Sequence, residues 1–113
     1  MQPDDIYLAS FPFGDAAGMK LRPVLLLTNR LGSVPEVVVA YISSVIPAAL
    51  LPSDIVLDPG DADAVSTNLK TKSVLRLHKL ATIHASAVVR RLGAISARTR
   101  DEVDIKLRAL LDL

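Results

Sequence analysis

The chain has 113 residues, half of them hydrophobic, and its formal net charge is +1. This length suffices for one domain with one core, so we expect residues 1–113 to form a single domain. The absence of cysteine excludes disulfides and thiolate metal sites. The chain has neither a signal-peptide pattern nor an apolar run long enough to span a membrane. We therefore expect a soluble, cytoplasmic protein that does not bind a membrane.

Short apolar segments separated by turn residues predict several β-strands. Residues 5–10 alternate between apolar and polar side chains, as in a half-buried strand. A loop with proline and glycine follows over residues 11–20. The next predicted strands are residues 24–28, residues 36–43, which we expect to be covered on both faces, and residues 54–58.

The second half of the chain predicts further strands and one helix. Residues 70–77 and 81–83 form either two short strands or one bent strand, and residues 87–95 form another, with Gly93 as a candidate bulge. Residues 99–102 form a capping box that starts a helix. Its apolar stripe consists of Val103, Leu107, Leu110 and Leu111. This order predicts a mainly β, α+β fold in which a compact, strongly bent sheet or barrel is closed by the helix.

The charge is unevenly distributed along the chain. Residues 64–100 contain eight lysines and arginines and no acidic residue, whereas residues 1–63 have a net charge of −5. Such segregation produces a local positive field even when the total charge is near zero. The cationic stretch is therefore either a solvated face or a surface that binds anions.

Arg22 precedes Pro23 at the predicted start of a strand. Proline is tolerated at the first residue of a strand, and it holds the preceding residue in an extended conformation. We therefore expect Arg22 at the rim of the sheet, where its planar, permanently charged guanidinium suits a phosphate group. The alternative is an ion pair between Arg22 and an acidic residue such as Asp15.

Hydroxyl, cationic and imidazole side chains supply the other candidates. Ser43 ends the predicted strand 36–43, next to Ser44, and its hydroxyl either caps a turn or donates to an anion held by Arg22. Arg76 and His78 share one face of a strand by the two-residue period. Together they suit phosphate chemistry, Arg76 by neutralising charge and His78 by moving a proton near neutral pH. The alternative for His78 is an inert surface histidine.

Metal or cofactor chemistry has little support in the sequence. The acidic turn at residues 58–63 lacks the frame of an EF-hand, and the two histidines lack the spacing of a zinc site. We expect no metal ion and no other cofactor.

Taken together, these segments resemble the MazF/PemK family of bacterial toxins, which are partners in type II toxin–antitoxin pairs. The resemblance covers nearly the whole chain. It is carried by DIYLASF, LRPVLLLTN, VVVAYISS, LPSDIVLD, SVLRLHKLATIH, VVRRLGAIS and the terminal helix. It implies a compact SH3-like β-barrel that forms a homodimer. It also implies a sequence-specific endoribonuclease, an mRNA interferase, that cuts single-stranded RNA without a metal ion.

The resemblance also assigns roles to residues. In the family, the arginine of the Arg-Pro pair and a hydroxyl residue closing the middle strand form the active site, which implies Arg22 and Ser43. PemK-type members add a stretch that matches Arg76 and, where the family has an acid, His78. Our hypothesis is that the RNA 2′-OH attacks the adjacent phosphorus to give a 2′,3′-cyclic phosphate. Residues predicted to bind the RNA are Phe11, Phe13, Lys20, Ser44 and Lys79.

Other partners and functions stay open. The resemblance implies a cognate antitoxin whose acidic, disordered tail would occupy the same cationic groove. Gyrase-poisoning toxins with the same barrel act without enzymatic chemistry, through a C-terminal helix and dimer surface, and leave RNA uncut. An SH3-like module that binds peptides is a further alternative. Peptide grooves of that kind are aromatic-lined, and this chain has only four aromatic residues.

Overall fold

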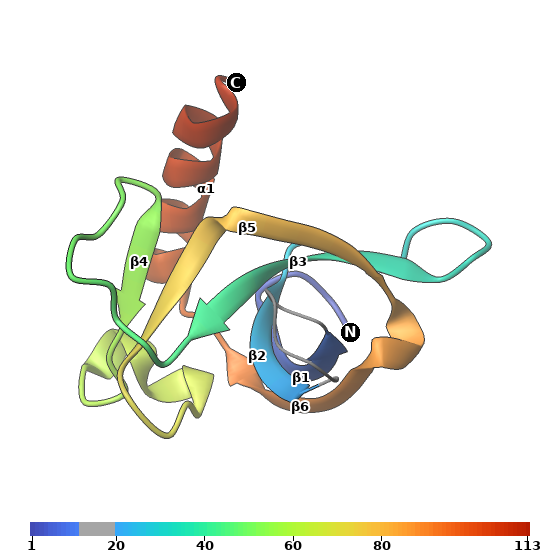
Figure 1. The fold of residues 1–113 in the computed structure, drawn as a ribbon, viewed down its shortest axis with the longest axis horizontal. Coiled ribbons are helices and arrows are strands. Elements are labelled where there is room, and N and C mark those ends of the chain that lie inside the picture. Colours follow the sequence, from blue (N-terminus) through green and yellow to red (C-terminus); the bar gives the residue numbers. More distant parts are fainter. Residues whose placement is uncertain (12–19) are drawn as a thin grey trace.

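The computed structural model of the chain describes residues 1–11 and 20–113 (Figure 1). These residues form one antiparallel sheet of six strands in the order β4-β5-β3-β2-β1-β6. The strands are β1 Asp5–Phe11, β2 Lys20–Leu26, β3 Glu36–Ser43, β4 Asp54–Leu57, β5 Ser73–His84 and β6 Val88–Ala94. The helices are the 3₁₀ turns η1 Ala62–Thr67 and η2 Ala85–Ala87 and the α-helix α1 Ala97–Leu111.

The sheet bends so strongly that it packs around two separate cores. In Figure 1, β1, β2, β3, β6 and the second half of β5 curl into a ring, while β4 and the first half of β5 extend toward α1. One core joins β1, β2, β3 and β5 and contains Ala9, Val24, Leu26, Val37, Val39 and Ile83. The other reaches α1 through Val103 and contains Leu25, Ile42, Leu57 and Leu75. Across the described strands, the two edges β4 and β6 do not pair, so the barrel is not closed.

The predicted class, mainly β with one terminal helix, is confirmed. The prediction of a strand over residues 36–43 matches β3. Of the segments 70–77 and 81–83, residues 73–77 and 81–83 belong to one bent strand, β5, and residues 70–72 precede it. β2 begins at Lys20, so Pro23 lies inside the strand and is not its first residue. In the described part of the chain, no helix is long and apolar enough to cross a membrane.

The predicted start of the helix was wrong. α1 begins at Ala97, and its N-cap is Ser96, whose Oγ accepts the Thr99 amide N–H at 3.1 Å. Thr99 therefore lies in the first turn, because Ser96 supplies the same capping chemistry three residues earlier. The apolar stripe is only partly covered: Val103 is buried, whereas Leu110 and Leu111 are exposed. Figure 1 shows the end of α1 projecting past the sheet.

Gly93 lies beside an irregularity in the pairing of β1 with β6. Ile6 pairs with Gly93 and the next residue, Tyr7, pairs with Arg91, so one residue of β6 is extra. The predicted irregularity at Gly93 is therefore present. A Cβ at this position would overlap the Ser66 carbonyl oxygen, which explains why glycine is needed where η1 approaches β6.

Candidate functional site

Arg22 and Ser43 lie beyond the last pair that β2 makes with β3. That ladder ends with Val24 opposite Tyr41, next to Pro23, which has no N–H to donate. Arg22 and Ser43 each lie two residues past this pair, so strand alternation places both on the face of Tyr41. On its other side, Arg22 still pairs with Ala9 of β1. The sheet therefore opens between β2 and β3 at the predicted pair of residues.

A pocket of about 250 Å³ lies at this opening. Its apolar lining is Leu8, Pro23, Ile42, Leu69 and Leu92, and its polar lining is Arg22, Ser44, Asn68, Lys70, Thr71, Ser73 and Arg90. Among these described residues there are three cations and no carboxylate. Ser44 lines the pocket. Ser43 does not line it, because strand alternation directs its side chain to the opposite face of β3 from Ile42. We call this the Arg22 pocket.

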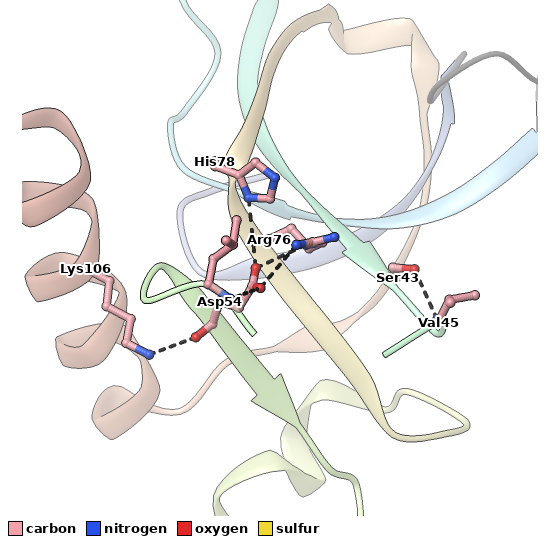
Figure 2. Close-up of polar contacts among 7 residues, drawn as sticks. Ser43, Val45, Asp54, Arg76, His78 and Lys106 are labelled. Carbon is pink, nitrogen blue, oxygen red and sulfur yellow. Dashed lines mark hydrogen bonds and ion pairs between the residues drawn. The ribbon is translucent and has the colours of Figure 1, made fainter. Parts of the chain in front are cut away.

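Ser43 makes a turn contact, which is one of the two alternatives predicted for its hydroxyl. Its Oγ accepts the Val45 amide N–H at 3.1 Å, which leaves the hydroxyl hydrogen free to donate (Figure 2). Ser43 lies opposite Val74 of β5, so Arg76 is its diagonal neighbour. Diagonal neighbours in antiparallel strands are about 7–8 Å apart, within reach of a long side chain.

Arg76 is held by an acid from the neighbouring strand. Asp54 begins β4 and lies directly opposite Arg76. The Arg76 Nε and Nη2 atoms donate to the two oxygens of this carboxylate at 3.1 and 3.2 Å (Figure 2). The Asp54 side chain is completely buried, and its Oδ2 also accepts the Leu51 amide N–H at 2.9 Å. A guanidinium has five N–H donors, so three remain for another ligand.

His78 lies in a wide bulge of β5. Ala40 pairs with Leu80 and the next residue, Tyr41, pairs with Arg76, so residues 77–79 have no partner in β3. Bulges of this kind redirect side chains. The His78 Nδ1 atom lies 4.0 Å from Asp54 Oδ1, and the imidazole is 30% exposed. Figure 2 shows that the contacts of His78 and Arg76, both on β5, converge on this carboxylate.

The same bulge contains Lys79. Its Nζ lies 5.5 Å from the centroid of the Tyr41 ring, a cation–π distance. Tyr41 pairs with Val24 of β2 on one side, which is the last pair between β2 and β3, and with Arg76 of β5 on the other side. Tyr41 therefore connects the opening at Arg22 with the bulge at His78 on one face of the sheet.

Residues 2–111 match the family described as PemK-like, MazF-like toxin of type II toxin-antitoxin system. The chain belongs to this toxin family. Comparison with curated proteins gives no sequence match.

Solved structures of mycobacterial proteins share the fold of this family member. The Mycobacterium tuberculosis toxin MazF-mt6 has a TM-score of 0.74 and 22% identity, covering 96% of this chain and 97% of that one. An endoribonuclease in complex with its cognate antitoxin from Mycobacterial species has a TM-score of 0.72 and 16% identity, covering 100% and 96%. An endoribonuclease from Mycobacterial species has a TM-score of 0.72 and 15% identity, covering 100% and 92%.

The Asp54 carboxylate in this toxin-family site is held in its charged form. Burial is the largest single influence and favours the neutral acid. The hydrogen bonds from the Leu51 amide and the Arg76 guanidinium, together with the charges of Arg76 and His78, outweigh it and lower the pKa of Asp54. Asp54 therefore acts as a fixed negative charge.

Sequence reasoning missed Asp54 although it predicted a strand at residues 54–58. The pairing of Asp54 with Arg76 joins positions 22 residues apart, and it depends on β4 lying next to β5. No spacing along the chain reports that adjacency. The family resemblance placed an acid two residues after the arginine, where this family member has His78. The structure supplies an acid at that point of the site from another strand.

Three of the predicted binding residues, Phe11, Phe13 and Lys20, flank or lie within residues 12–19, which the structure does not describe. Phe13 lies outside the described residues, as does Asp15, the alternative partner of Arg22. Phe11 is the last residue of β1, and its side chain is outside the description. Lys20 is exposed at the start of β2.

The acidic turn of this toxin-family member has structural contacts of its own. Asp58 Oδ1 accepts the Gly60 amide N–H at 2.9 Å, and Asp63 pairs with Arg98 at 3.4 Å. Within residues 1–11 and 20–113, no three histidine or acidic side chains gather as a metal site would require.

Proposed function

We propose that this family member is the endoribonuclease of a type II toxin–antitoxin pair and cuts single-stranded RNA at a short preferred sequence. The observation that carries the proposal is the Arg22 pocket, whose described lining combines three cations and several hydroxyl groups with no carboxylate. Nucleic-acid backbones are recognised by such sites. Two of the structurally similar mycobacterial proteins are named endoribonucleases, which supports the same assignment.

Arg22 and Ser43 would hold the reacting phosphate. They leave the sheet on one face, where the ladder between β2 and β3 ends. The Arg22 guanidinium would bind two phosphate oxygens at once, and the free hydroxyl hydrogen of Ser43 would donate to one of them. Both contacts strengthen as negative charge builds on the phosphorus centre, and such stabilisation is the largest contribution that a site of this kind makes.

The nucleophile would come from the RNA. The 2′-oxygen attacks the adjacent phosphorus, the bond from phosphorus to the 5′-oxygen breaks, and the products are a 2′,3′-cyclic phosphate and a 5′-hydroxyl. Arg76 would use its remaining donors on the same phosphate, and His78 would accept the proton of the 2′-hydroxyl. The departing 5′-oxygen would take a proton from water to become the 5′-hydroxyl. We propose that no metal ion takes part. DNA would bind but stay uncut, because it lacks the 2′-hydroxyl.

The RNA would extend from this centre over cationic and aromatic side chains. Ser44, Lys70 and Arg90 would contact phosphates or sugars within the Arg22 pocket. Lys79, held against Tyr41, and Lys20, exposed on β2, would add charge on either side. Phe11 and Phe13 would stack on bases.

We propose two protein partners for this family member: a second copy of the chain, as a homodimer, and a cognate antitoxin. The end of α1 offers surface for such contacts, since Ile105, Leu110 and Leu111 are exposed. A groove of about 390 Å³ between α1 and the residues before β4 is mostly apolar and has His78 at its edge. An antitoxin segment seated there would cover the proton-transfer residue. The substrate would place the toxin in the cytoplasm.

Cleavage of a long single-stranded RNA in excess EDTA tests the proposal. The wild-type protein should cut it to defined fragments, and Arg22→Ala should lower kcat/KM at least about 100-fold, as expected for loss of a charge-stabilising donor. Arg30→Ala is the matched control, because Arg30 is an exposed arginine in the turn after β2, away from the pocket. Circular dichroism should show that both variants are folded.

The same assay separates the alternatives. A gyrase-poisoning toxin or a peptide-binding module leaves the RNA intact under all conditions. A strict requirement for Mg²⁺ would refute the metal-free scheme while keeping the nuclease assignment. Equal activity of wild type and Arg22→Ala would remove the Arg22 pocket from the mechanism.

A further inference from the structure

Asp54 is the most constrained charged side chain of the site, and no step of the proposed reaction uses it directly. Both carboxylate oxygens accept hydrogen bonds, from Arg76 and from the Leu51 amide. The Lys106 Nζ of α1 donates to the Asp54 backbone oxygen at 2.8 Å (Figure 2). This lysine is itself paired with Glu102 at 3.0 Å. A carboxylate fixed at both its backbone and its side chain can orient the groups around it.

We infer that Asp54 is a positioning residue that holds the Arg76 guanidinium and turns His78 so that its Nδ1 faces the carboxylate and its Nε2 faces the substrate. The inference rests on the proposed function for its catalytic meaning. The orientation of His78 is inferred from the 4.0 Å distance between its Nδ1 and Asp54 Oδ1, and it can be tested without RNA.

The Asp54 carboxylate favours one of the two neutral tautomers of His78. A neutral imidazole carries one proton, and a carboxylate beside Nδ1 favours the form in which that nitrogen is the donor. The unprotonated nitrogen is then Nε2, on the far side of the ring from Asp54. An acid that fixes the histidine tautomer in this way supports proton transfer without taking the proton itself.

The described charged groups around His78 are cations apart from Asp54. On β5 its charged neighbours are Arg76 and Lys79, and Lys79 is directed to Tyr41. From α1, Lys106 lines the same groove as His78. Asp54 of β4 is the acid that pairs with His78 among the described residues. Among these charged groups, only the Asp54 carboxylate favours a proton on Nδ1.

His84 provides an internal reference on the same strand. Its Nδ1 accepts the Ser86 amide N–H at 3.0 Å, so neutral His84 must carry its proton on Nε2. The two histidines of the chain are therefore predicted to be opposite tautomers.

Long-range ¹H–¹⁵N spectra of the ¹⁵N-labelled protein at alkaline pH give the first test. Wild-type His78 should be mainly the Nδ1–H tautomer and His84 the Nε2–H tautomer. In Asp54→Asn, His78 should shift toward Nε2–H, whereas His84 should not change. Wild-type His78 in the Nε2–H form would overturn the inference, and this outcome is readable even if Asp54→Asn does not fold.

A double-mutant cycle in RNA cleavage gives the second test. Asp54→Asn should lower kcat at least about tenfold with little change in KM, because the residue would act in the transition state and not in binding. In a His78→Gln background the same substitution should lower kcat clearly less, because residues that act as a unit are not additive. Equal effects in both backgrounds would show that Asp54 does not act through His78.

The two tests also separate this inference from the proposed function. If the wild-type protein does not cut RNA, the nuclease proposal fails, but the spectra still decide the orientation of His78. If the protein cuts RNA and His78 has the opposite tautomer, the proposed function stands and the role of Asp54 is wrong.

Discussion

Arg76 combines a fixed position with free hydrogen-bonding capacity. An exposed arginine samples many rotamers, and ordering it on a ligand costs entropy. Here two hydrogen bonds to Asp54 hold the guanidinium before any ligand binds, and the side chain stays 19% exposed. The carboxylate also offsets the charge of Arg76. Arg22, which has no ion-pair partner among the described residues, would therefore supply most of the net positive charge at the phosphate.

Because of the buried Asp54 carboxylate, the free energy of unfolding should depend on pH. Its pKa in the folded protein is below the ordinary value of 3.8, so the unfolded chain binds the proton more readily. The stabilising contribution is complete above that ordinary value and is lost as the pH falls through the folded-state pKa. Asp54→Asn should lower the free energy of unfolding by about 1–3 kcal/mol at pH 7, because a charged hydrogen-bond partner of Arg76 is lost.

Thermal or urea unfolding of wild type and Asp54→Asn from pH 7 down to pH 3 checks this prediction. The difference between the two proteins should narrow below about pH 4, where the unfolded wild-type chain takes up a proton on Asp54 more readily than the folded protein does. A difference that stays constant over the whole range would mean that the carboxylate charge does not stabilise the fold.

At the scale of the elements, two interruptions of regular pairing create the site. Pro23 stands where the ladder between β2 and β3 ends, and the bulge at residues 77–79 turns β5 from one half of the sheet to the other. The first interruption opens the Arg22 pocket, and the second projects His78 beside Asp54. Both occur on strands that also carry buried core residues, so the site rests on a rigid frame.

The helix α1 is connected to the site through one lysine. Lys106→Met should keep the apolar contacts of the side chain but lose the hydrogen bond to the Asp54 backbone oxygen. We expect the free energy of unfolding to fall by about 0.5–1.5 kcal/mol. RNA cleavage should fall severalfold, because the Asp54 carboxylate would be held less firmly. Urea unfolding and initial cleavage rates measure the two effects.

Arg108→Met is the matched control for this prediction. Arg108 is an exposed residue two positions further along α1, and its side chain makes no hydrogen bond or ion pair within the described part of the chain. It should change cleavage by less than Lys106→Met does. If the two variants lose activity equally, the helix does not support the site through Lys106.

The strands themselves were predictable from the sequence, since alternation and turn residues are local signals. The strand at residues 36–43 was predicted with the observed bounds. One bent strand was one of two alternatives for residues 70–83, and the observed β5 begins three residues later than that segment. The capping residue of α1 was misplaced, because Ser96 and Thr99 are both capable caps and the choice depends on how the chain leaves β6. The role of Asp54 and the bulge at residues 77–79 come from strand adjacency, which one-dimensional patterns do not contain.

At the scale of the whole molecule, the separation of charge along the sequence becomes a separation of surfaces. The Arg22 pocket takes its cations from β2, β6 and the segment before β5. A pocket of similar size, about 260 Å³, lies beside η1 and is lined by Asp58, Asp61, Asp63 and Glu102 with Arg98. A polyanion would be attracted to the first and repelled by the second, which favours one orientation of the RNA on the toxin.

The most direct test of the central claim is the chemistry of the product ends. A short RNA containing the preferred sequence, cut in EDTA, should give fragments whose masses correspond to a 2′,3′-cyclic phosphate and a 5′-hydroxyl. The same RNA with a single 2′-deoxy nucleotide before the scissile phosphate should stay intact. Fragments with a 5′-phosphate, or cleavage of the deoxy-substituted strand, would contradict attack by the 2′-hydroxyl at a phosphate held by Arg22 and Ser43.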